Sequence, residues 1–301
     1  MSETRGSDQP RRVASTPFVV EPISNHTHSL ILLHGLGSNG FKFGAELLDS
    51  GKTSDGKTLT ELFPGARFIF PTAKRRRSSA FRRAMLTQWF DIASLEDPSH
   101  RSHTQLQGLE QSSREILALI EHEVENVPRE NIIIGGISQG CAMAFSCLLA
   151  LGSPIGGFIG MSGWLPFATE IDELLNIGDE LNGSDEDLFS DNENSFESSE
   201  DDERSVDAIV KVHQHARELL ALQTTEDQAS KDLFSTPIFL GHGEADPKVN
   251  PALGEEACRI LRSVGFEVSW KCYEGLGHWY KIPDEIDDIV EFIEKKTQWA
   301  K

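Results

Sequence analysis

Several short apolar runs in this chain lack the alternation of apolar and polar residues that marks a strand with one solvent-exposed face. They include LILL at residues 30–33, IIIGG at 132–136 and PIFL at 237–240. Strands that are covered on both faces read this way, and they occur mainly in parallel sheets. Longer stretches with apolar residues at helical spacing lie between them. This order predicts an α/β fold, with a mostly parallel sheet and helices on both faces.

The same patterns assign individual elements. We predict strands at residues 18–21, 29–33, 67–70, 131–134, 157–161, 237–240 and 267–273. We predict helices at residues 104–126, 139–151, 206–222, 252–264 and 283–299.

One acidic segment departs from this order. Residues 167–207 hold sixteen Asp and Glu against one Arg, which accounts for most of the formal net charge of −20. Within this segment, residues 172–205 have too few apolar side chains to offset the loss of chain entropy on folding. We therefore expect a disordered insertion at about 172–205 within one domain at 17–301, preceded by a disordered tail at 1–16.

The composition also indicates in which cellular compartment the protein is located. No apolar run approaches the roughly 20 residues that span a bilayer, and the first residues lack an apolar signal core. The four cysteines show neither CxxC spacing nor the density of a disulfide scaffold, and we expect Cys141 and Cys147 to be buried free thiols. We expect a soluble cytoplasmic protein, with a nuclear location as the alternative.

The motif GISQG, residues 136–140, lies between an apolar run and a helix that is rich in small residues. This is the strand–turn–helix setting of a nucleophile elbow, which presents a serine above the edge of a sheet. The glycines allow the strained turn to pass close to neighbouring backbone, and the helix N-terminus favours a developing anion. We predict that Ser138 is a nucleophile; a glycine-rich turn without chemistry is the alternative.

Two later loops hold candidate partners for Ser138. GHGEAD, residues 241–246, follows the run PIFL, and GLGH, residues 275–278, follows EVSWKCYE. The order Ser, Asp, His, each after a strand, is that of α/β-hydrolases. We predict that His278 is the general base and that Asp246 orients it. Glu244 is the chemical alternative to Asp246, and a surface turn is the alternative for His278.

A glycine-rich loop, LHGLG at residues 33–37, follows the run LILL. In this fold such a loop brings a second backbone N–H to the oxyanion. We assign the oxyanion donors to the N–H groups of Leu36 and Gln139, each typically worth ~3 kcal/mol in the transition state. His34 lies inside this loop, and we expect it to have a structural role rather than to act as the base.

Six motifs in sequence order resemble the acyl-protein thioesterase and carboxylesterase family, also called the phospholipase/carboxylesterase family. They are LILLHGLGSNG, QWFDI, GISQG, MSGWLP, GHGEADPKV and YEGLGHW. The resemblance implies the α/β-hydrolase fold and hydrolysis of acyl thioesters or carboxylic esters, without metal or cofactor. It implies the same triad, working through an acyl-enzyme, and the same oxyanion donors. From QWFDI and MSGWLP we further place Trp89, Trp164 and Leu165 against the substrate.

The resemblance implies an acylated protein or a lipid ester as partner, and we expect no nucleic-acid partner. A lysophospholipase-like esterase and a hydrolase fold that binds an acyl ligand without turnover are the alternatives. The chain departs from the family at Ser38, in the acidic insertion, and in the loop KRRRSSAFRRAMLTQ at residues 74–88. Three interpretations of this basic loop stay open: a rim for transient contact with anionic membranes, a nuclear import signal, or a solvated loop neutralised by the insertion.

Overall fold

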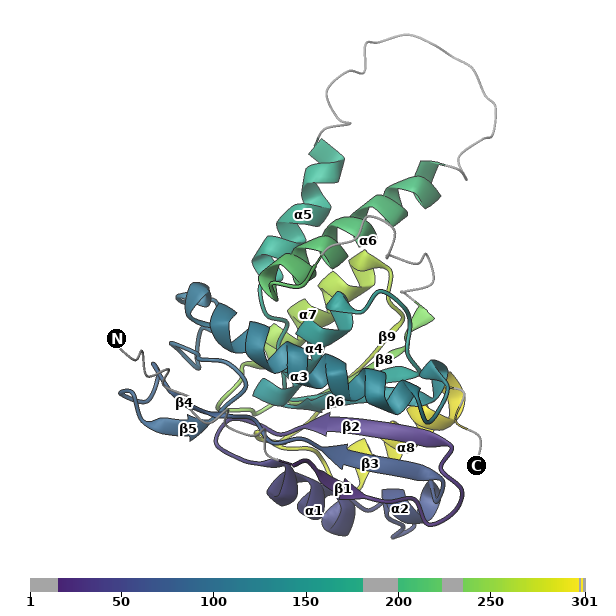
Figure 1. The fold of residues 1–301 in the computed structure, drawn as a ribbon. Coiled ribbons are helices and arrows are strands. Elements are labelled where there is room, and N and C mark those ends of the chain that lie inside the picture. The colour runs from purple at the N-terminus through teal and green to yellow at the C-terminus, as the bar shows by residue number, and fades with distance from the viewer. Residues whose placement is uncertain (1–15, 181–199, 224–234, 298, 300–301) are drawn as a thin grey trace, which may run out of the picture.

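A seven-stranded sheet forms the centre of the computed structural model, which describes residues 16–180, 200–223, 235–297 and 299 (Figure 1). Its strand order is β1-β3-β2-β6-β7-β8-β9. Every neighbouring pair is parallel except β1 with β3. The strands are β1 Phe18–Val20, β2 His28–Leu33, β3 Ala66–Phe70, β6 Ile132–Ile137, β7 Gly157–Met161, β8 Ile238–Gly243 and β9 Val268–Tyr273.

Helices cover both faces of this sheet, each over its own apolar core. On one face lie α1 Gly40–Ser50, α2 Leu59–Leu62 and α8 Asp284–Lys296. On the other lie α3 Leu106–Val124, α4 Gln139–Ala150 and α7 Pro251–Val264. Every residue of β2, β6, β7 and β8 is buried, as strands covered on both faces must be. The predicted α/β-hydrolase architecture is confirmed.

Most predicted elements lie within a few residues of the observed ones. No element was predicted at residues 40–50, and residues 74–88 were interpreted as a loop, but both regions form regular structure. Helix α1 begins at Gly40. Asn39 precedes it, and the Asn39 side-chain oxygen accepts a hydrogen bond from the Lys42 N–H and so caps the helix. The basic loop is a hairpin, in which β4 Arg75–Arg77 pairs antiparallel with β5 Met85–Thr87. Two short 3-10 helices, Ser102–Thr104 and Arg129–Asn131, complete the described elements.

The acidic insertion predicted at 172–205 is helical at both ends, which corrects the prediction of disorder there. Helix α5 spans Ala168–Glu180, and α6 spans Glu200–Leu219. The start of α5 is fixed because Ile171 is buried and the Asp172 carboxylate forms two hydrogen bonds of 2.9 Å with Arg259 of α7. Helix α6 packs against α4, and Val212 is buried in that contact. Residues 1–15, in the predicted tail, and 181–199, in the predicted insertion, lie outside the described residues.

None of the described helices has both the length and the apolarity needed to cross a bilayer.

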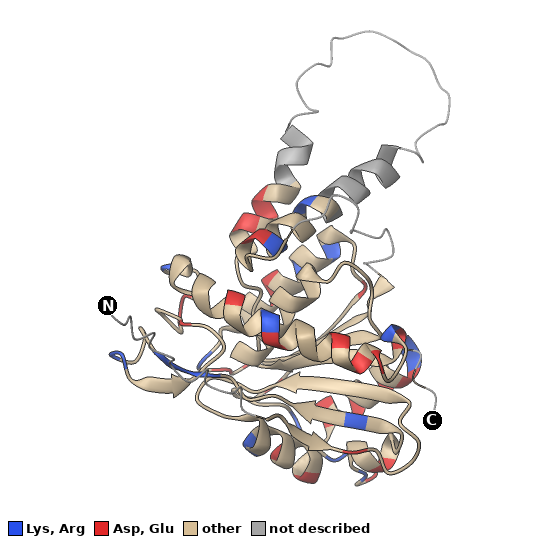
Figure 2. Ribbon diagram, in the orientation of Figure 1, with Lys and Arg blue, Asp and Glu red and all other residues tan. Residues whose placement is uncertain are grey.

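Figure 2 shows acidic side chains on the described part of α5, whereas basic side chains follow the β4–β5 hairpin. Cys141 and Cys147 are buried free thiols, as predicted, and burial raises the pKa of both.

Candidate active site

Ser138 lies at the turn between β6 and α4, with a backbone conformation of φ 57° and ψ −125°. This conformation is rare for a non-glycine residue and is held by its surroundings: the Ser138 N–H donates to the Met161 carbonyl at 2.9 Å. Glycine is required on both sides of the turn. A Cβ on Gly136 or Gly140 would lie 2.5 or 2.1 Å from the carbonyl oxygen of Leu33. The turn therefore has the geometry predicted for a nucleophile elbow.

Asp246 and His278, from the loops after β8 and β9, form a hydrogen-bonded pair. His278 Nδ1 donates to Asp246 Oδ2 at 2.8 Å. The other carboxylate oxygen of Asp246 accepts from the N–H groups of Lys248 and Val249 at 2.8 and 3.0 Å. Burial alone would raise the pKa of Asp246, but hydrogen bonds from His242, from His278 and from this backbone outweigh burial and lower the pKa well below its usual range. Asp246 is therefore an anion suited to orienting the His278 ring.

The alternative acid, Glu244, does not contact His278 in the described structure. It is exposed, and its Oε2 accepts a hydrogen bond of 3.4 Å from the N–H of Gly275. The geometry therefore selects Asp246 over Glu244 as the partner of His278.

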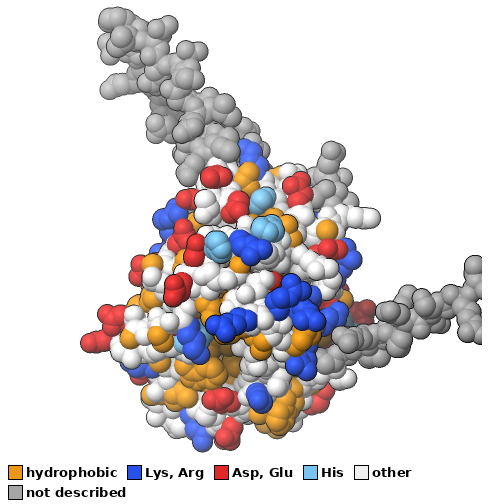
Figure 3. Space-filling model, turned by 90° about the vertical axis from the view of Figure 1, so that its left-hand side faces the viewer, with side chains coloured by type: hydrophobic (Ala, Val, Ile, Leu, Met, Phe, Trp, Pro, Cys, Tyr) orange, Lys and Arg blue, Asp and Glu red, His pale blue; other side chains and the backbone are white. Residues whose placement is uncertain are grey.

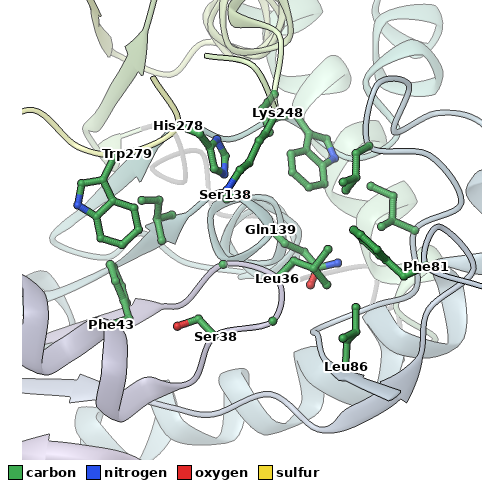
Figure 4. Close-up of a pocket in the computed structure, with 17 residues that line it drawn as sticks. Leu36, Ser38, Phe43, Phe81, Leu86, Ser138, Gln139, Lys248, His278 and Trp279 are labelled. Atoms are coloured by element: carbon green, nitrogen blue, oxygen red, sulfur yellow. The ribbon is translucent and has the colours of Figure 1, made fainter. Parts of the chain in front are cut away.

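Ser138 and His278 open onto one cavity of about 540 Å³ (Figure 4). Side chains from both ends of the chain line it, and most of them are apolar. The lining residues include Leu36, Phe43, Phe81, Leu86, Ile92, Leu95, Ile137, Gln139, Trp164, Lys248, Val249 and Trp279. A cavity of this size and character is typical of a site for a small molecule or an acyl chain.

The loop after β2 lies directly against Ser138. A Cβ on Gly35 would be 3.3 Å from the Cβ of Ser138, and Leu36 and Gln139 both line the cavity. Neither the Leu36 N–H nor the Gln139 N–H donates a hydrogen bond to another group in the described part of the chain. Both N–H groups are thus free to donate a hydrogen bond to a group bound beside Ser138; their assignment to an oxyanion stays a prediction.

The sequence profile of the phospholipase/carboxylesterase family matches residues 14–180 and 211–297. The chain belongs to this family. It is 26% identical to acyl-protein thioesterase 1 of Gibberella zeae, over 93% of this chain and 95% of that protein. It is 27% identical to acyl-protein thioesterase 1 of Saccharomyces cerevisiae, over 92% and 96%. As a member of this family, the chain is an ester hydrolase.

A solved structure bears out the fold. The crystal structure of Zea mays acyl-protein thioesterase 2 superposes with a TM-score of 0.61 and 23% sequence identity, covering 93% of this chain and 98% of that one. At this identity the likeness concerns the fold alone.

His34 has the structural role that we predicted for it. It is fully buried, its Nε2 accepts from the Ala73 N–H at 3.0 Å, and its Nδ1 donates to the Gly35 carbonyl at 2.8 Å. Burial lowers the pKa of His34 to about 4, although the bond to Gly35 partly opposes this. His34 is therefore neutral. Its two hydrogen bonds hold the glycine-rich loop in place, and it is not among the residues that line the cavity.

Of the three side chains that we placed against the substrate, only Trp164 lines the cavity. Trp89 is buried beneath the site: its indole N–H donates to the His34 carbonyl at 2.8 Å. Its backbone N–H donates to the side-chain oxygen of Gln139 at 3.0 Å. Leu165 lines a separate small cavity beside α5 and α6. The motifs QWFDI and MSGWLP thus supply both side chains that line the cavity and buried side chains that pack beneath or beside it.

Three features of the site escaped the sequence analysis. The β4–β5 hairpin brings Phe81 and Leu86 to the cavity. Lys248, two residues after Asp246, also lines it. His242 makes a second contact to Asp246, at 3.3 Å. The only available signal was the position of these residues in GHGEADPKV and in the basic loop. In the described part of the chain, no group of three or more His, Cys, Asp or Glu side chains is placed to hold a metal ion.

Proposed function

We propose that this family member hydrolyses acyl thioesters or esters by a Ser138–His278–Asp246 triad, through an acyl-enzyme. The observation that carries the proposal is the Asp246–His278 pair, with Oδ2 and Nδ1 2.8 Å apart, which opens with Ser138 onto one apolar cavity.

In this mechanism His278 Nε2 takes the proton of the Ser138 hydroxyl as its oxygen attacks the acyl carbonyl carbon. The N–H groups of Leu36 and Gln139 stabilise the oxyanion that forms. The tetrahedral intermediate collapses, the bond to the leaving thiol or alcohol breaks, and His278 donates the proton to the leaving group. Water then attacks the acyl-enzyme in the same way, with His278 as base, and releases the free acid and Ser138.

The relatives named acyl-protein thioesterase favour a cysteine-linked acyl group on a protein as the substrate. The apolar lining of the cavity supports this, because an acyl chain bound against Phe43, Phe81, Leu86 and Trp164 would remove apolar surface from water. A lysophospholipid ester presents the same acyl chain and is the alternative substrate. Binding of an acyl ligand without turnover is the alternative function.

The test is Ser138→Ala, measured with an S-octanoyl-cysteine peptide and with a lysophospholipid. Loss of the nucleophile should lower kcat by about 10⁴- to 10⁶-fold, and a fluorophosphonate probe should label the wild type at Ser138. The control is Ser146→Ala, at a half-buried serine of α4 outside this cavity, which should keep wild-type turnover and labelling. Turnover by Ser138→Ala at the wild-type rate would contradict the mechanism. If the wild-type protein binds an acyl ligand but does not hydrolyse either substrate, the non-catalytic alternative is favoured.

We also propose that an anionic membrane surface is a transient partner, contacted through the β4–β5 hairpin, on the cytoplasmic side where anionic lipids lie. Phe81 and Met85 are 43% and 40% exposed, and both lie on this short hairpin. The exposed arginines of the hairpin are Arg75, Arg77, Arg82 and Arg83. Figure 3 shows basic side chains gathered beside apolar ones on the face that carries the hairpin.

Contacts with α3 support this arrangement, because they hold the base of the hairpin in place. Lys74 pairs with Glu115, and Arg76 donates to Gln111 at 2.7 Å. The tip therefore presents apolar and cationic side chains together at the cavity, where a lipid-anchored substrate enters.

A further inference from the structure

Among the described residues that line the cavity, Lys248 is the one lysine or arginine, and none is Asp or Glu. It follows Asp246 by two residues in the loop between β8 and α7. Figure 4 shows its side chain extending into the cavity beside His278, with the terminal nitrogen directed toward Ser138. The site therefore holds a cation next to Ser138 and His278 in mostly apolar surroundings.

Within the described part of the chain, the Lys248 ammonium has no ion pair and no hydrogen bond; only its backbone N–H is engaged, by Asp246. The nearest acid along the loop is Asp246 itself, whose side chain is fully buried. Its carboxylate already accepts from two backbone N–H groups and from His278. Asp246 thus has no exposed oxygen for Lys248, and the ammonium can pair with an anion brought by a substrate.

The position of Lys248 indicates which part of the substrate it meets. In acyl transfer the base that takes the serine proton later gives it to the leaving group, so the leaving group lies on the side of His278. Lys248 lies on that same side (Figure 4), because its loop also holds the acid that orients His278. The apolar side chains from the β4–β5 hairpin, Phe81 and Leu86, line another part of the cavity and suit the acyl chain.

Building on the proposed function, we propose that Lys248 is a specificity-determining residue that selects acyl-cysteine substrates with a carboxylate beside the modified cysteine. The ammonium binds the carboxylate of the leaving peptide while the acyl chain fills the apolar part of the cavity. The pair forms at a partly solvated mouth, since Lys248 is exposed. At such a mouth two unit charges attract moderately and added salt screens them, so the preference should be about tenfold in kcat/KM.

The test compares two N-acetylated, C-amidated tripeptides with an S-octanoyl cysteine in the middle. One has aspartate on both sides of the cysteine, and the other has asparagine, which has nearly the same shape and no charge. For the wild type, kcat/KM for the aspartate peptide should exceed that for the asparagine peptide by about tenfold at low salt. In Lys248→Met this ratio should fall to one or below, and in Lys248→Glu it should invert. Because the ratio is taken within one enzyme preparation, it is independent of any loss of active protein.

Lys211→Met is the matched control. It removes the same charge from an exposed lysine of α6 that does not line the cavity, and it should keep the wild-type ratio. A wild-type ratio near one, with the asparagine peptide turned over, would overturn the role of Lys248 and leave the proposed function standing. If Lys248→Met still prefers the aspartate peptide by the wild-type ratio, the role of Lys248 is also overturned, and the preference is assigned to the arginines of the hairpin. If the wild type hydrolyses neither peptide, the proposed thioesterase function fails, and this inference fails with it.

Discussion

The imidazole of His242 lies against Asp246, with its Nε2 3.3 Å from the same carboxylate oxygen that His278 contacts at 2.8 Å. The Nε2 of His242 is also 3.0 Å from the carbonyl oxygen of Val249. Both neighbours are acceptors, so Nε2 carries the proton. His242 and the backbone N–H groups of Lys248 and Val249 thus hold the carboxylate in one orientation, and this orientation aims the His278 ring.

His242→Leu tests this positioning role. A hydrogen bond to a charged group contributes about 1.5–3 kcal/mol, and the 3.3 Å contact favours the lower end, so kcat/KM should fall by about tenfold. His213→Leu is the control, because His213 is also buried and bonded to a carbonyl oxygen, that of Leu149, but lies outside the cavity. Both variants should melt earlier, and only His242→Leu should lose activity. An equal loss of Tm with unchanged kcat/KM in both would contradict the role of His242.

Glu285 predicts how stability depends on pH. It is buried at the start of α8, and burial raises its pKa to about 8; a hydrogen bond from the Lys281 N–H opposes this, and the charge of Asp288 adds to it. Between the unfolded value of about 4.3 and about 8, the folded protein holds a proton that the unfolded chain has released. The free energy of unfolding should therefore fall as pH rises through this window.

Glu285→Gln removes this titration and keeps the shape of the side chain. At pH 5 the two proteins should differ little. By pH 8 the variant should be the more stable, by about 3.5 kcal/mol, since one proton contributes about 1.4 kcal/mol per pH unit over most of this window. The measurement is urea denaturation from pH 5 to 9. Parallel pH dependences in the two proteins would show that Glu285 is ionised in the folded state.

Gly140→Ala tests the close approach that forms the elbow. The added Cβ would lie 2.1 Å from the Leu33 carbonyl oxygen, and this is backbone that cannot rotate away. Such overpacking should lower the free energy of unfolding by about 3 kcal/mol or more. Gly277→Ala is the control, since the nearest atom to its new Cβ is Pro247 Cδ at 3.9 Å. Chemical denaturation of both variants measures the difference, and equal stabilities would refute the close packing of β2 against α4.

The double variant Arg82→Gln/Arg83→Gln tests the membrane contact. Each arginine near an anionic surface contributes about 1 kcal/mol, so binding to phosphatidylserine vesicles at low salt should weaken by about 30-fold. Vesicle sedimentation measures this, and the difference should shrink as salt is added. Lys57→Gln/Lys211→Gln removes the same charge from exposed positions outside the hairpin and should bind like the wild type. Equal vesicle binding by both double variants would show that the hairpin arginines are solvated and have no membrane role.

Helix α5 shows where composition misled the sequence analysis. Its acidic residues favour disorder when they are counted over the whole segment, 172–205. Yet Ile171 is buried, and Asp172 pairs with Arg259, 87 positions away in the chain. The β4–β5 hairpin was missed for a related reason. All three interpretations of its arginines treated the segment as a loop, whereas Arg76 is held by Gln111 and Ser112 of α3.

The sequence by itself determined the strand–helix order, the tight turn at Ser138, and the two loops that bring Asp246 and His278 together. These features depend on local properties: apolar runs, glycines where backbones must pass closely, and the order of loops at one sheet edge. Only the tertiary structure decided that Trp89 and Leu165 do not line the cavity. It alone showed that His242 contacts Asp246 and that Lys248, which has no ion pair among the described residues, faces the cavity. The physical reason is that these roles depend on which way a side chain points and on what distant segments place beside it, and no local pattern encodes either.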